Sequence, residues 1–183
     1  FADYQLGAPK FGKLVYTVIS ASNTVTSVMT GELDMFIQSA SIEDSLAAEE
    51  MGLPVQKSDL PTSIVAFLIN NQNVPDKKVR QAMSYAIDKQ MLIDQSLQGQ
   101  GVPATTCIIP GSQYEFGTKW ERNVDKAKEL LAEAGWDSGK TLKMVVTSAR
   151  ESMAAVIQQN LAEAGLNIEV QTVELATMFS GLQ

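Results

Sequence analysis

The sequence contains no histidine and only one cysteine, Cys107, among its 183 residues. The absence of histidine excludes Ser-His-Asp and Cys-His catalytic arrangements, zinc sites with histidine ligands and histidine general bases. A single cysteine excludes an internal disulfide and metal sites built from several cysteines. We therefore expect no cofactor and no bound metal. The enzyme hypothesis that stays open is a carboxylate-dependent hydrolase built on Asp34 and a partner.

Basic residues are in the minority, with 14 Lys and Arg against 21 Asp and Glu, so the net charge is −7. An acidic surface repels phosphate groups, which disfavours nucleic acids and anionic membranes as partners. Acidic residues are adjacent at 43–44 and at 49–50. On a helix, the two side chains of such a pair point about 100° apart and do not converge on one site. Together with the missing histidine, this counts against an enzyme.

Long apolar runs are also missing, since no segment approaches the ~18 residues that a membrane helix needs. The hydrophobic content of 45% and the charged content of 19% are typical of a globular protein. We expect one domain over residues 1–183. The chain begins at Phe1 without an initiator Met or a signal-like segment, which predicts a processed protein or an internal piece of a longer one.

One pattern occurs four times along the chain: an amphipathic segment, then a glycine, then an apolar or alternating run. A glycine just after a helix adopts the left-handed conformation that closes the last helical turn. The four glycines are Gly31, Gly52, Gly135 and Gly165. The last two end an identical LAEAG sequence, which indicates a repeated helix-to-strand unit.

The order of these segments predicts a strand–helix–strand unit near each end of the chain. The predicted elements are strands 13–20 and 34–37 around helix 22–30, and strands 141–147 and 167–173 around helix 151–164. Strands joined by a helix run parallel, with a right-handed connection. The apolar run 63–69 lacks polar alternation and predicts a strand covered on both faces. The predicted fold class is α/β, with a mixed, mostly parallel sheet and helices on both faces.

The stretch that begins with residues 75–90, PDKKVRQAMSYAIDKQ, predicts two short helices at about 76–86 and 89–98, with Asp88 as a cap between them. Its apolar residues recur at spacings of three and four, which describes a buried stripe. They are Val79, Ala82, Met83, Ala86 and Ile87. Arg80 lies beside this stripe and is expected to pair internally. The stretch is therefore interpreted as scaffold.

Small polar residues follow three of the predicted strands, at 38–41, 70–73 and 147–150. In open α/β sheets, ligands bind beyond the carboxyl ends of strands, where amides and hydroxyls can hold a peptide or sugar backbone. The guanidinium of Arg150 can also pair with a ligand carboxylate in a planar, two-point contact. The alternative is that these are ordinary turn and cap residues. The predicted ligand-facing residues are Gln38, Ser39, Asn71, Cys107, Ser148 and Arg150.

Several runs of the sequence resemble, in the same order, the motifs of one family. They are Met29–Asp34, Phe67–Asn70, Val79–Ala82, Ala86–Lys89, Gly99–Ala104 and Val124–Trp136. As a set they are similar to the family 5 extracellular solute-binding proteins, the dipeptide and oligopeptide receptors of ABC importers. The resemblance spans essentially all 183 residues.

This resemblance implies a receptor with two lobes that closes on its ligand like a hinged trap and performs no chemical step. The chain would be a C-terminal-lobe fragment with a type II periplasmic-binding-protein-like fold, and the missing other lobe would complete the site. An acidic partner for the α-amino group of a peptide would lie beyond Gln183. Arg150 would stand in for the Arg-x-Tyr element of peptide-binding relatives.

The resemblance also implies a monomer that delivers peptides or similar small solutes to the permease subunits of an ABC transporter. It would be periplasmic or extracellular and, at full length, anchored to the membrane as a lipoprotein. Two alternatives stay open. The ligand could be another solute, such as a sugar or a nickel chelate, or the chain could be a sensor or adaptor domain that binds a protein partner with the same fold.

Overall fold

The computed structural model describes residues 7, 10–19, 23–36, 42–58, 61, 63–116 and 120–180. The chain divides into two compact units, Phe1–Gln56 and Lys57–Gln183. Their assignment to a single domain stays a prediction. Within the described ranges, none of the helices has the length and apolar character required to cross a membrane.

The first unit contains two short helices, α1 (Thr24–Met29) and α2 (Ile42–Glu50), which contact each other. The described parts of the two predicted strands, 13–19 and 34–36, are not strands. Most apolar side chains of 13–19 face solvent, with Val18 100% exposed, while Ile19 is half-buried. The helix of the first predicted unit is therefore confirmed, whereas its strands are wrong in the described residues. The backbone of a strand needs a hydrogen-bonded neighbour, and no strand is found in the described part of this unit.

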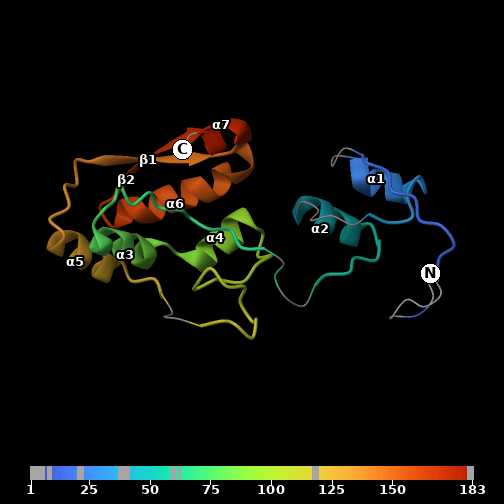
Figure 1. The fold of residues 1–183 in the computed structure, drawn as a ribbon, viewed down its shortest axis with the longest axis horizontal. Coiled ribbons are helices and arrows are strands. Elements are labelled where there is room, and N and C mark those ends of the chain that lie inside the picture. The colour runs from blue at the N-terminus through green and yellow to red at the C-terminus, as the bar shows by residue number, and fades with distance from the viewer. Residues whose placement is uncertain are drawn as a thin grey trace. The chain divides into compact units, whose positions relative to one another are not determined.

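The second unit is built on a β-α-β crossover (Figure 1). Strands β1 (Thr141–Val146) and β2 (Asn167–Thr172) pair in parallel, with Thr141 opposite Asn167 and Val146 opposite Thr172. Helix α6 (Glu151–Glu163) connects the strands and packs against both of them. The predicted strand–helix–strand unit at 141–173 is confirmed.

Further helices pack in a layer with α6. Helix α3 (Lys77–Ala86) lies against α5 (Val124–Glu133), while α4 (Lys89–Ser96) lies against α6. A short helix, α7 (Leu175–Ser180), follows β2. One hydrophobic core joins α3, α5, α6 and the sheet, and its buried side chains include Val79, Ala82, Met83, Leu130, Leu131, Met144, Leu161, Leu166 and Ile168.

The start of α3 and the α3–α4 junction follow the sequence prediction. The Asp76 carboxylate accepts a hydrogen bond from the Lys78 backbone N–H at 2.6 Å, and the Asp88 carboxylate accepts one from the Met91 N–H at 2.9 Å. Both acids therefore cap a helix, as expected of Asp at this position. The members of the predicted stripe that lie within α3 are all buried, while Ile87 at its end is half-buried and packs against the core.

The two LAEAG glycines close helices α5 and α6. Gly135 has a φ of +61° and Gly165 a φ of +95°, conformations that a residue with a β-carbon adopts at a steric cost. In both turns the next backbone N–H returns to the helix: Trp136 donates to the Leu131 carbonyl at 2.9 Å, and Leu166 to the Leu161 carbonyl at 2.9 Å. The predicted helix ends are confirmed here, and Gly31 and Gly52 also have positive φ angles, of +75° and +76°.

The apolar segment 63–69 is not a strand. Ile69 packs against the core, but Leu68 is 79% exposed and Val65 and Phe67 also face solvent. The prediction of a strand covered on both faces is wrong in this structure, because no described segment forms a ladder with its backbone. The observed fold is a mixed α/β arrangement with a parallel sheet of two strands, so the class is confirmed and the described sheet is smaller than predicted.

Arg80 is expected to stabilise the entry into α3. Its Nη1 donates to the carbonyl oxygens of Val74 at 2.8 Å and Pro75 at 2.7 Å, which confirms an internal structural role. Arg80→Ala should lower the free energy of unfolding by about 1 kcal/mol, the usual net contribution of such hydrogen bonds. Urea denaturation measures the change. Lys77→Ala, an exposed position on the same helix, is the control, and an equal loss in both variants would contradict the role of Arg80.

Candidate functional site

The carboxyl end of the sheet presents an exposed polar turn. Directly after β1 and Thr147, the short 3-10 helix η2 (Ser148–Arg150) leads into the first turn of α6. The Arg150 N–H donates to the Thr147 carbonyl at 2.9 Å and closes this turn. Ser148 and Arg150 are both exposed. The structure therefore places these two predicted site residues together, at the sheet edge where ligands bind in α/β folds.

The guanidinium of Arg150 is not used in an ion pair within the described part of the chain. Its Nη1 lies 4.0 Å from the sulfur of Met153, one turn along α6. The adjacent carboxylate, Glu151, instead accepts a hydrogen bond from the Thr172 hydroxyl at 2.8 Å. A planar guanidinium with free donors is suited to two-point binding of a carboxylate.

Thr172 belongs to the same edge but was missed by the sequence reasoning. It is the last residue of β2, and the following residue, Val173, donates its N–H to the Val146 carbonyl at 2.9 Å. The ends of β1 and β2 are thus held side by side. The signal that could have found Thr172 is the rule already applied to β1, since the carboxyl ends of parallel strands share one edge.

Asn71 lies away from this edge. It is an exposed residue of the turn that follows segment 63–70, and its neighbour Asn70 accepts a hydrogen bond from the Gln72 N–H at 2.8 Å. Two residues on, Asn73 lines a hollow of about 250 Å³ together with Asp137 and Lys140, which precede β1. The turn therefore lies near the amino end of β1, about 20 Å of strand from Ser148.

The direction of segment 63–70 explains this separation. The segment leads into α3 at the end of the unit where β1 begins (Figure 1). The turn that follows it therefore lies at the amino end of β1 and not at the carboxyl end. The polar residues 70–73 and 147–150, which follow two of the predicted strands, do not lie at the same end of the sheet as expected. The third exit, with Gln38 and Ser39, lies outside the described residues.

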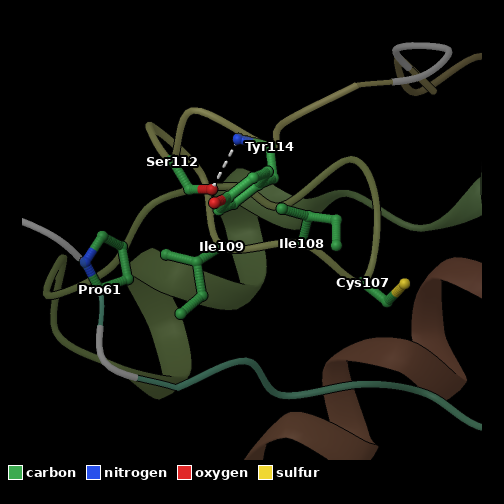
Figure 2. A pocket seen from close by; sticks show the side chains of 6 residues that line it. All are labelled: Pro61, Cys107, Ile108, Ile109, Ser112 and Tyr114. Carbon is green, nitrogen blue, oxygen red and sulfur yellow. Dashed lines mark hydrogen bonds between the residues drawn. The ribbon is translucent and has the colours of Figure 1, made fainter.

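Cys107 is exposed and lines a second hollow, of about 410 Å³, in the loop after α4. Figure 2 shows Cys107 at one end of this hollow and Pro61 at the other, with the remaining lining residues between them: Ile108, Ile109, Ser112 and Tyr114. The Ser112 hydroxyl accepts a hydrogen bond from the Tyr114 N–H at 3.1 Å. The wall is mostly apolar and uncharged, and none of the other predicted site residues belongs to it.

Metal ligation is not indicated in the described part of the chain, where no cluster of three or more Cys, Asp or Glu side chains could hold an ion. The described site residues thus lie in three places: the polar turn with Ser148 and Arg150, the apolar hollow beside Cys107, and the separate turn with Asn71. The chemistry available is hydrogen bonding, carboxylate pairing and apolar contact.

Comparison with known proteins matches almost the whole chain to one family. The family described as "Bacterial extracellular solute-binding proteins, family 5 Middle" matches residues 1–181. Among curated proteins, the chain is 31% identical over 201 residues to the oligopeptide-binding protein AppA of Bacillus subtilis (strain 168), covering 96% of this chain and 36% of AppA. It is 27% identical over 185 residues to the glutathione-binding protein GsiB of Escherichia coli O157:H7, covering 95% and 35%. The chain spans about a third of the length of these relatives.

Solved structures give the same match. The ABC transporter substrate-binding protein CtaP from Listeria monocytogenes superimposes with a TM-score of 0.75 at 23% identity, over 98% of this chain and 38% of CtaP. AppA from Bacillus subtilis, in complex with a nonapeptide, superimposes with a TM-score of 0.61 at 28% identity, over 87% of this chain and 36% of AppA. At its identity, the CtaP match supports the fold alone.

Proposed function

The chain belongs to the bacterial extracellular solute-binding proteins of family 5, and on that premise we propose that it forms one lobe of the substrate-binding component of an ABC transporter. Proteins of this family are transport receptors and not enzymes. This confirms the expectation, drawn from the missing histidine and the scattered acids, that the chain performs no chemistry. The carboxylate-dependent hydrolase built on Asp34 is thereby set aside.

The ligand that we propose is a peptide. The observation that carries this proposal is the 31% identity to an oligopeptide-binding protein over 96% of the chain. A related structure holds a nonapeptide, and another relative is a glutathione-binding protein. An uncharged, mostly apolar hollow and the exposed guanidinium of Arg150 also suit a peptide, which offers apolar side chains and one terminal carboxylate.

In the proposed complex, Ser148 and Arg150 bind the ligand at the carboxyl edge of the sheet, with Arg150 holding its carboxylate. Cys107 and the apolar hollow contact side chains of the ligand. Gln38 and Ser39 keep their predicted roles as ligand-facing residues. Asn71 is left out of this proposal because its turn lies near the other end of β1.

The mechanism that we propose is closure of two lobes on the ligand. A ligand that contacts both lobes shifts the open–closed equilibrium by its differential affinity for the closed state. In the full-length protein, the two-stranded sheet would extend into the larger sheet of a type II binding protein. The receptor would act as a monomer outside the cytoplasmic membrane, anchored as a lipoprotein, and deliver the ligand to the permease.

Ligand binding by the full-length protein tests this function. We expect peptides to raise the melting temperature, since a ligand that binds only the native state stabilises it by mass action. The panel would contain peptides of two to nine residues, glutathione, sugars and nickel–histidine chelates, with calorimetry to confirm each hit. If no peptide at millimolar concentration shifts the melting temperature, the peptide assignment fails. A shift with a sugar or a nickel chelate alone would assign the ligand to that class, and a protein partner with no small ligand would favour the sensor or adaptor hypothesis.

A further inference from the structure

The charges at the carboxyl edge of the sheet are arranged in an unexpected way. Arg150 and Glu151 are neighbours in the sequence and carry opposite charges. Glu151 nevertheless binds the Thr172 hydroxyl, at 2.8 Å, and forms no ion pair with Arg150. The hydroxyl comes from the end of β2, a different element 21 residues further along the chain.

This hydrogen bond fixes the carboxylate of Glu151 on the β2 side of the turn. Glu151 also lies in the first turn of α6, where the helix dipole favours a negative charge. The acid is therefore engaged by β2 and the helix terminus and not by the guanidinium of Arg150. Without the hydroxyl, the carboxylate would be able to turn toward Arg150 and reduce its attraction for another carboxylate.

We infer that Thr172 is a positioning residue: its hydroxyl holds the Glu151 carboxylate and so keeps Arg150 available for the carboxylate of the ligand. The inference rests on the proposed function, since it requires a peptide whose terminal carboxylate contacts Arg150. It extends that function to the residues that set a preference for free acids over amides. Neither residue needs to touch the ligand for this role.

Thr172→Val removes only the hydroxyl and keeps the shape of the side chain. The probes are alanine tripeptide, pentapeptide and nonapeptide, each as a free acid and as a C-terminal amide, titrated by calorimetry into the full-length protein. We expect Thr172→Val to weaken binding of the free acids by about threefold to tenfold, the range of one lost hydrogen bond, and to leave the amides unchanged. Adding Glu151→Gln to this variant should restore the free-acid affinity, because the competing charge is then absent.

Two control variants separate positioning from simple stability. Thr141→Val makes the same substitution at the other end of the sheet and should change neither affinity. Glu151→Gln alone should not weaken binding of the free acids. If Thr172→Val does not fold, the Glu151→Gln variant still tests the inference. A loss of free-acid affinity in the Glu151→Gln variant would overturn it.

The outcomes distinguish this inference from the proposed function. Failure of the wild-type protein to bind any of the peptides, here and in the wider panel, removes the proposed function and the inference together. Equal binding of acids and amides by the wild-type protein leaves peptide binding intact but overturns the inference. The same holds if Thr172→Val weakens both forms equally, which would show a structural role only.

Discussion

Leu161→Ala is expected to lower the free energy of unfolding by about 2–5 kcal/mol, the range for truncating a fully buried leucine. The side chain is 0% exposed and belongs to the core that joins α3, α5, α6 and the sheet. Its carbonyl also accepts the hydrogen bond from Leu166 that turns the chain into β2. The cavity left by the substitution would therefore lie where the helix layer meets the sheet.

The measurement is native-state hydrogen exchange of the α6 and β2 amides in the full-length protein, supported by urea denaturation. Leu175→Ala is the matched control, because Leu175 is 56% exposed at the start of α7 and should change stability by less than about 0.5 kcal/mol. Similar losses in the two variants would mean that Leu161 is not part of the core described here.

The elements that the sequence predicts correctly depend on signals within a short stretch of chain. The α3 stripe and the Asp88 cap both arise from contacts between residues a few positions apart. The β-α-β unit spans only 141–173, and its two strands pair directly with each other. Spacing, caps and glycines are sufficient in such cases because the partners are encoded nearby.

The wrong predictions concern strands whose partners are not nearby. Segments 13–19 and 63–69 have the composition of strands, but neither pairs with another segment in the described part of the chain. Strand formation depends on neighbouring strands more than on intrinsic preference. No local pattern in the sequence reports whether such a neighbouring strand is present.

The candidate site, like the fold, was predicted correctly only where it depends on a correctly predicted strand. The prediction that Ser148 and Arg150 lie exposed at the carboxyl end of the sheet is correct, because the strand that precedes them was predicted correctly. The turn with Asn71 was assigned to the same edge under the assumption that segment 63–69 runs parallel to β1. The sequence of one segment does not determine in which direction that segment runs relative to β1. The rule that ligands bind beyond the carboxyl ends of strands was therefore applied to a turn that lies at the opposite end of the sheet.

Arg150→Ala is expected to weaken binding of free-acid peptides to the full-length protein by about tenfold or more, since hydrogen bonds to charged groups exceed neutral ones in strength. The corresponding C-terminal amides should lose little, because they lack the charge that the guanidinium recognises. Arg150→Lys should restore part of the affinity, as an ammonium supplies the charge without the planar fork.

Lys143→Ala is the matched control for this prediction. Lys143 is an exposed basic residue on β1, so its loss changes the net charge by the same amount without touching the turn at 148–150. Calorimetry of acids and amides with each variant separates a local contact from general attraction between the protein and an anion. If both variants lose the same affinity, the effect is long-range and should vanish with added salt. If only Arg150→Ala loses affinity, and mainly for free acids, the result supports the proposed contact between Arg150 and the peptide carboxylate at the carboxyl end of the two-stranded sheet.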